Sequence, residues 1–202
     1  ASNRLRLTLE TLTSPPVARL AQLIGLRHLT AQIAENAGRE RALLAGVVGA
    51  RAKLGMEGYE RLSALRAKVE LAWDTVLPVR LRSDLAVQIG EAMTEVEKSY
   101  FGAYGETRAL VLAGGEAGDY KITGPEYFTR ATAGINAVLK LGEAIGAAAG
   151  SEAAMQAEAS ARNFILTGLL LCASLALAGL SFWITFSRIL NPLSAIAGAM
   201  GR

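Results

Sequence analysis

The sequence predicts an all-α protein, an antiparallel four-helix bundle whose last helix continues into a transmembrane helix. Three observations lead to this class. Apolar residues recur at alternating spacings of three and four, as in helices that bury one face. Beyond a brief alternation at residues 4–9, no run of alternating β-branched or aromatic residues is long enough to predict a strand. The stretch from Phe164 to Phe186 contains no charged residue, and about 20 apolar residues suffice to cross a bilayer core of roughly 30 Å.

The charge-free stretch divides the chain into three expected parts. Arg162 and Arg188 flank it, and Trp183 lies near its second end, where aromatic rings favour the headgroup layer. A wholly buried helix is the alternative, but the rest of the chain is too small to surround it. We therefore expect a bundle over residues 1–162, a transmembrane helix over 163–187 and a linker start over 188–202.

Composition favours long helices and narrows the range of functions. Of the 202 residues, 51% are hydrophobic but only 6% are aromatic, which suits helices packed through small side chains. The net charge of +3 comes from interleaved acids and bases without a basic stripe, so no nucleic-acid partner is expected. The single cysteine, Cys172, and the single histidine, His28, predict neither a disulfide nor a metal site. With no nucleophile–base pair and no phosphate loop, we expect no enzyme activity and no cofactor.

The first predicted helix begins at Ser14-Pro15-Pro16, where a Ser N-cap precedes proline. It extends to about Leu54. Two polar residues, Asn36 and Glu40, interrupt its otherwise apolar seam. The seam comprises Leu26, Leu29, Ile33, Asn36, Glu40, Leu43, Val47, Ala50 and Leu54.

Two further helices follow breaks at Gly55 and Gly58. The second covers about residues 57–76 and ends before Pro78, because the residue before proline disfavours helix. The third begins at the cap Ser83-Asp84 and extends to about Ala113. Their seams comprise Leu62, Leu65, Val69, Ala72 and Val76, and then Leu85, Ile89, Ala92, Val96, Ser99, Ala103, Thr107 and Leu110.

The fourth helix begins after a loop at residues 114–119. Thr123 and Glu126 have the spacing of a capping box. No breaker lies between Glu152 and the charge-free stretch, so we expect one continuous helix. Short connections then imply an up-down-up-down order, with both ends of the bundle at the membrane. The seam comprises Phe128, Ala131, Ile135, Val138, Gly142 and Ile145.

Residues 188–193, with Pro192, resemble the opening of a HAMP linker, the dimeric relay beneath the membrane span of bacterial receptors. This resemblance implies a homodimer in the bacterial inner membrane, with the bundle in the periplasm and Pro192 onward in the cytoplasm. It also implies a first transmembrane helix before Ala1.

The segment Ala34 to Arg41, AENAGRER, is similar to the first bundle helix of sensor domains that detect nitrate and nitrite. It differs from them at Glu40, where glutamine is common, and at Ala42, where the related Glu-Arg-Gly form has glycine. The resemblance implies the ligand-sensing and transmembrane signalling portion of a bacterial chemoreceptor that detects a small anion such as nitrate. The input module of a histidine kinase or of a cyclic-nucleotide signalling enzyme, and a ligand-free membrane-anchored bundle, are the alternatives.

The candidate ligand-binding residues are Asn36, Arg39, Glu40 and Arg41. A buried, unpaired Glu40 would cost several kcal/mol, so it needs a partner. The forked donors of arginine suit planar anions. The alternatives are a polar layer that fixes helix register and simple exposure. A second cluster, Trp73, Tyr100, Phe101 and Tyr104, is either a pocket wall or core packing.

Overall fold

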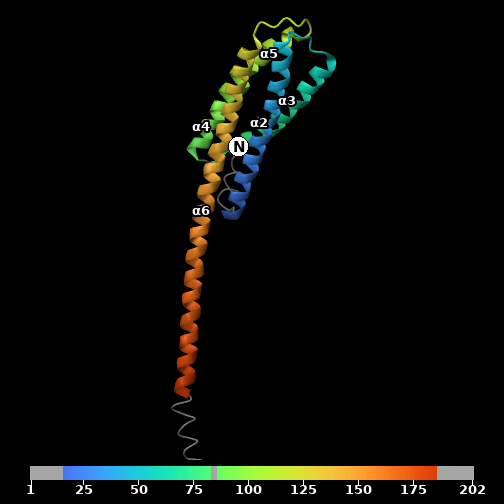
Figure 1. The fold of residues 1–202 in the computed structure, drawn as a ribbon. Coiled ribbons are helices and arrows are strands. Elements are labelled where there is room, and N and C mark those ends of the chain that lie inside the picture. Colours follow the sequence, from blue (N-terminus) through green and yellow to red (C-terminus); the bar gives the residue numbers. More distant parts are fainter. Residues whose placement is uncertain (1–15, 83–85, 186–202) are drawn as a thin grey trace, which may run out of the picture. The chain divides into compact units, whose positions relative to one another are not determined.

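The computed structural model describes residues 16–82 and 86–185, and every regular element within these ranges is helical (Figure 1). The predicted all-α class is therefore confirmed for this part of the chain. The chain divides into two compact units, Ala1–Ala153 and Ala154–Arg202. The elements are α2 (Pro16–Gly49), α3 (Met56–Val76), the 3₁₀-helix η1 (Leu77–Leu81), α4 (Val87–Val96), the π-helix η2 (Glu97–Tyr104), α5 (Gly105–Gly115) and α6 (Gly124–Thr185).

Helix α2 ends at Gly49, earlier than the predicted end near Leu54. Arg51 adopts a positive φ of 48°, which turns the chain out of the helix. Leu54 is nevertheless buried, because its N–H donates to the Gly115 carbonyl at 2.8 Å and its side chain joins the core. Tertiary contacts with the end of α5 therefore replace the last predicted helical turn.

The second helix agrees closely with its prediction. Helix α3 ends at Val76, the position that Pro78 indicated, and continues as the short η1. Four residues of the predicted seam are buried, while Leu65 is half-buried. The buried four are Leu62, Val69, Ala72 and Val76.

The third predicted helix consists of α4, η2 and α5, and its buried face shifts in the middle. The prediction holds at Ile89, Val96 and Thr107. Met93, Tyr100 and Tyr104 are buried where the predicted seam passed through Ala92, Ser99 and Ala103. A π-helix has more residues per turn than an α-helix, and within η2 the buried side chains are Tyr100 and Tyr104. The predicted cap Ser83-Asp84 and Leu85 lie outside the described residues.

Helix α6 begins as predicted, with Thr123 at its start. The Glu126 N–H donates to the Thr123 Oγ1 at 3.3 Å, which is one half of a capping box. The other half is absent because the Glu126 carboxylate accepts from Arg130 at 2.6 Å. The seam prediction was wrong at Phe128, which is 46% exposed, whereas its neighbour Tyr127 is buried.

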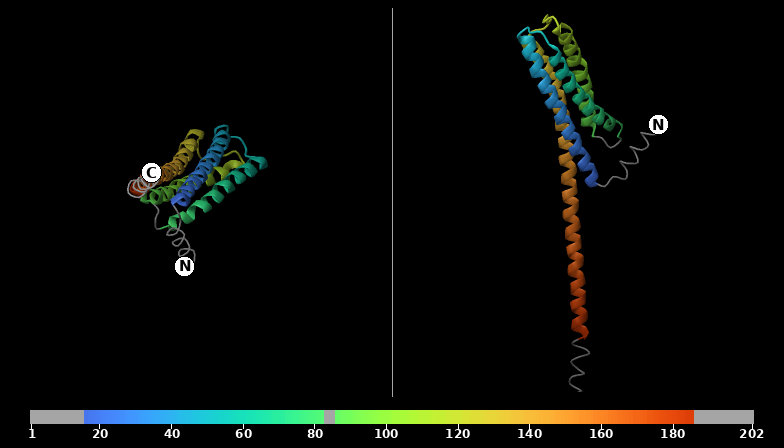
Figure 2. Two further views of the ribbon diagram at one scale, coloured as in Figure 1. Left: turned by 90° about the horizontal axis from the view of Figure 1, so that it is seen from below. Right: turned by 90° about the vertical axis from the view of Figure 1, so that its right-hand side faces the viewer.

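The core of the first unit draws on every long helical segment, which lie side by side in Figures 1 and 2. Close contacts join α2 to α6 at three positions along the two helices. Arg41 donates to Thr132 at 2.9 Å, Thr30 faces Gly142, and Arg19 pairs with Glu152 at 3.2 Å. The core includes Ile33, Leu44, Leu62, Val69, Met93, Val96, Leu141 and Ile145.

The second unit contains the rest of α6. The described side chains from Phe164 to Ile184 are exposed within the structure, including the large apolar ones. This stretch makes α6 long and apolar enough to cross a membrane. The end of the predicted transmembrane helix and the linker-like residues 188–202 lie outside the described residues.

Candidate functional site

The structure places the residues of the predicted site on different sides of α2. Consecutive residues of an α-helix differ by about 100° in direction, because one turn takes 3.6 residues. Glu40 therefore faces the core, Arg39 faces solvent beside α3, and Arg41 faces α6. Within one chain, these three side chains do not converge on a single ligand.

Glu40 is completely buried and forms an ion pair with Arg108 of α5. The Arg108 Nε–H donates to Oε1, while the second oxygen, Oε2, has no hydrogen-bond partner among the described residues. Burial raises the pKa of Glu40 above its usual value of 4.5, although Arg108 and Arg66 act in the opposite direction. The partner that Glu40 was expected to need is therefore inside the same chain.

A second arginine, Arg66 of α3, completes this interior cluster. Its Nε–H donates to Glu70 at 2.7 Å, and its guanidinium lies 5.1 Å from the centre of the Phe101 ring. Its Nη1 and the Tyr100 hydroxyl are both buried without a described hydrogen-bond partner. We call Glu40, Arg66, Tyr100 and Arg108 the buried polar layer.

The four predicted aromatic residues pack in the core at this layer, and one of them, Tyr100, belongs to it. Trp73 and Phe101 have ring centres 5.2 Å apart, and Tyr100 lies 5.1 Å from Phe101. The hydroxyls of Tyr104 and Tyr127 are hydrogen-bonded at 3.0 Å, and burial raises the pKa of both. These rings fill space between helices, which is the packing alternative that the sequence left open. Tyr127 was not predicted, because the expected seam of α6 passed through its neighbour.

Two members of the predicted site make contacts typical of structural residues. The guanidinium of Arg41 donates to Thr132 at 2.9 Å and lies 4.5 Å from the centre of the Phe128 ring. The Asn36 amide donates to the Gln32 carbonyl at 2.8 Å, one turn earlier on α2. Phe128 is thus an exposed ring that a cation covers.

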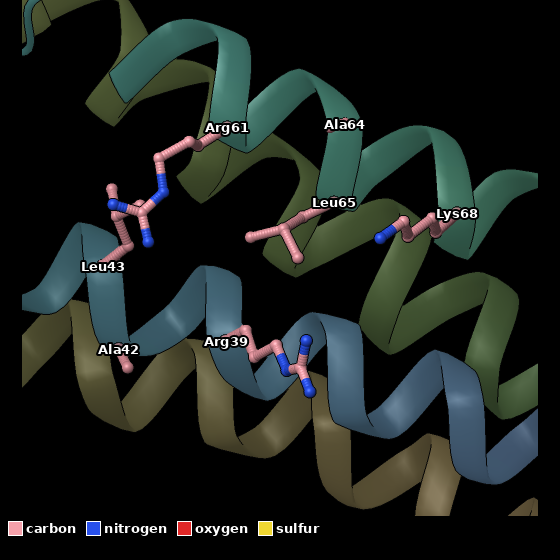
Figure 3. A pocket seen from close by; sticks show the side chains of 7 residues that line it. All are labelled: Arg39, Ala42, Leu43, Arg61, Ala64, Leu65 and Lys68. Atoms are coloured by element: carbon pink, nitrogen blue, oxygen red, sulfur yellow. The ribbon is translucent and has the colours of Figure 1, made fainter. Parts of the chain in front are cut away.

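Arg39 is the predicted site residue that faces an open groove. The groove lies between α2 and α3 and encloses about 610 Å³ (Figure 3). Two further cations, Arg61 and Lys68, line it from α3. Arg39 also pairs with the exposed Glu35, one turn away. The remaining lining residues are Ala42, Leu43, Ala64 and Leu65.

Arg61 and Lys68 were not predicted, although they share a spacing of seven residues on the solvent side of the α3 seam. The sequence could not place this side of α3 next to Arg39 of α2. Among the described residues, no group of three or more His, Cys, Asp or Glu side chains could hold a metal ion.

Comparisons with protein-family models, with curated proteins and with solved structures found no match to this chain. Its function is therefore inferred from its own residues.

Proposed function

We propose that this chain is the ligand-sensing and transmembrane signalling portion of a bacterial chemoreceptor that detects a small anion. In this proposal residues 1–162 form a periplasmic antiparallel four-helix bundle. Residues 163–187 cross the inner membrane, and residues 188–202 begin a HAMP linker.

The continuity of α6 is the observation that carries the proposal. This one helix contributes core residues such as Ala131 and Ile145 to the first unit, and it also contains the charge-free stretch after Arg162. A helix shared by a sensor and a membrane span couples the two mechanically, because a shift at one end moves the other. Such helix shifts are a known means of transmitting binding events.

The contacts of α2 with α6 support the antiparallel arrangement. Going toward earlier residues of α2, from Arg41 to Arg19, the partners on α6 move later, from Thr132 to Glu152. The same order holds between α3 and the segment formed by η2 and α5. Tyr59 near the start of α3 donates to the Leu112 carbonyl of α5 at 3.0 Å, while Trp73 near the end of α3 contacts Phe101 of η2.

Anion sensing rests on the basic character of the site. Arg39 is the one member of the predicted set, Asn36, Arg39, Glu40 and Arg41, that lines the groove with Arg61 and Lys68. Glu40 is paired inside the chain, so it contributes to anion binding through the position of α2 rather than by direct contact. Guanidinium groups bind planar oxyanions such as nitrate by their forked donors.

The second candidate function is a ligand-free, membrane-anchored structural bundle. The internal pairing of Glu40 with Arg108 favours it, because such a pair can fix helix register without any ligand. A sensor module of a histidine kinase or of a cyclic-nucleotide signalling enzyme would use the same features as a chemoreceptor.

Cysteine labelling of the full chain in inner-membrane vesicles of known orientation tests the topology. In a Cys172→Ser background, a membrane-impermeant maleimide from the periplasmic side should label Ser151→Cys but not the matched Ser194→Cys. Equal labelling of both positions would reject the topology. Calorimetry with nitrate, nitrite and small carboxylates then separates the two functions, since a structural bundle should bind none of them.

A further inference from the structure

The groove between α2 and α3 carries an excess of positive charge. All of its polar lining side chains, Arg39, Arg61 and Lys68, are cations. Arg39 already shares its charge with Glu35. Arg61 and Lys68 form no ion pair with any described residue, although Glu57 lies one turn before Arg61. Both cations can therefore pair with an anion that binds in the groove.

The groove also has an apolar middle with cations toward its two ends. Arg61 and Lys68 are seven residues apart on α3, which corresponds to roughly 10.5 Å of helix rise. Leu65 lies between them, the Lys68 amine points back toward Leu65, and the Arg61 guanidinium lies beside Leu43 (Figure 3). Arg39 faces this middle from α2.

We propose that this groove binds a short aliphatic dicarboxylate. One carboxylate accepts two hydrogen bonds from the Arg61 guanidinium, whose fork matches its geometry. The other carboxylate binds the Lys68 ammonium, and the methylene groups between them lie on Leu65 and Leu43. This assignment rests on the proposed anion-sensing function and names the chemical class of its ligand.

Because Arg61 and Lys68 lie toward opposite ends of the groove, the length of a ligand decides whether it can bind both cations. A monoanion such as nitrate or acetate neutralises one end and leaves the other cation unpaired. It also leaves the apolar middle of the groove, at Leu65 and Leu43, exposed to water. A dicarboxylate contacts both α2 and α3, so it binds the folded state alone and stabilises it by mass action. Because the groove is open, its electrostatic attraction should weaken as salt rises.

Isothermal titration calorimetry on the full chain in nanodiscs tests the groove, with succinate, glutarate, acetate and nitrate as probes. Succinate or glutarate should bind at least tenfold more tightly than acetate and nitrate. Arg61→Gln and Lys68→Gln should each weaken dicarboxylate binding at least tenfold. The matched control is Lys140→Gln, which removes an exposed lysine of α6 outside the groove and should leave the affinity unchanged.

The outcomes separate this inference from the proposed function. If both α3 variants bind dicarboxylates as wild type does, or if dicarboxylates bind no more tightly than acetate, the groove assignment is overturned. Nitrate binding that persists in those variants would then still support anion sensing. If none of the four probes binds wild type, the anion-sensing proposal fails together with the groove. Melting temperatures of both variants close to wild type ensure that lost binding reflects the groove and not unfolding.

Discussion

The ion pair between Glu40 and Arg108 lies in the interior of the first unit, where the Glu40 side chain is completely buried. Removing one partner of such a pair leaves the other charged, buried and unsolvated, which costs about 3–5 kcal/mol. Exposed pairs one helical turn apart contribute only about 0.3–0.5 kcal/mol, because water and salt screen them. The buried pair Glu40–Arg108 should therefore contribute much more to stability than the exposed pair Glu35–Arg39.

We expect Arg108→Ala to lower the free energy of unfolding by about 3–5 kcal/mol at neutral pH, because Glu40 loses its partner. Arg39→Ala is the matched control and should cost about 0.5 kcal/mol or less, since Arg39 and Glu35 are both exposed. Urea unfolding of the full chain in nanodiscs, monitored by circular dichroism, measures both. Similar losses in the two variants would contradict the assigned burial of Glu40.

The raised pKa of Glu40 predicts a pH dependence of stability with a definite sign. The folded state holds this proton more tightly than the unfolded state, because burial disfavours the carboxylate. The stability that protonated Glu40 contributes to the folded state is fully present below the usual pKa of 4.5. It is lost as the pH rises through the pKa of Glu40 in the folded state. Glu40→Gln cannot titrate, so the stability of wild type relative to this variant should fall as the pH rises above 4.5. If the stability of wild type relative to Glu40→Gln stays constant or grows as the pH rises, the pKa of Glu40 is not raised in the folded state.

At the scale of single residues, the sequence predicted the interior position of Glu40 and its need for a partner. Both follow from a charged residue on an apolar seam, and both are confirmed. It did not predict Arg108, because the regular seam of the third helix passed through Thr107. Arg39, Arg61 and Lys68 lie together only because α2 and α3 are packed side by side.

At the scale of elements, the π-helix η2 decides which side chains enter the core. Tyr100 and Tyr104 are buried where the predicted seam passed through Ser99 and Ala103. The large tyrosine rings need room, and the facing residue of α6 is Gly134. A Cβ atom at Gly134 would lie 3.0 Å from the Tyr104 Cβ and 3.2 Å from the Ser99 carbonyl oxygen. Helix α6 thus approaches the backbone of η2 as closely as glycine allows.

We expect Gly134→Ala to destabilise the first unit by about 1–3 kcal/mol, because its methyl group meets backbone atoms that cannot move aside. Gly150→Ala is the matched control on the same helix, since a Cβ there meets nothing within 4 Å. Alanine is the better helix former, so the control should be neutral or stabilising by up to about 1 kcal/mol. Thermal unfolding of the two variants would contradict this packing if both gained stability.

At the scale of the whole molecule, α6 belongs to both compact units. The proposed signalling route requires two chains, because a HAMP relay works as a dimer. We expect the full chain in detergent to sediment as a dimer, with a dimer fraction that rises with protein concentration. A bound dicarboxylate that prefers the dimer should increase that fraction by mass action. A strict monomer at high concentration, with and without succinate, would count against the proposed signalling route.

Four features could be predicted from the amino-acid sequence alone: the all-α class, the bounds of α3, the start of α6 and the apolar stretch after Arg162. These features depend on local chemistry, namely periodicity, caps, prolines and a run without charge, which one segment carries alone. Four others became visible only in the folded chain: the early end of α2, the burial of Tyr100 and Tyr104 at η2, the pairing of Glu40 with Arg108 and the groove of Arg39, Arg61 and Lys68. Each of these depends on a neighbouring helix. After the end of α2, for example, Leu54 binds the Gly115 carbonyl of α5, and Tyr100 and Tyr104 of η2 pack in the core against α6. Such contacts join residues far apart in the chain, so no local pattern encodes them.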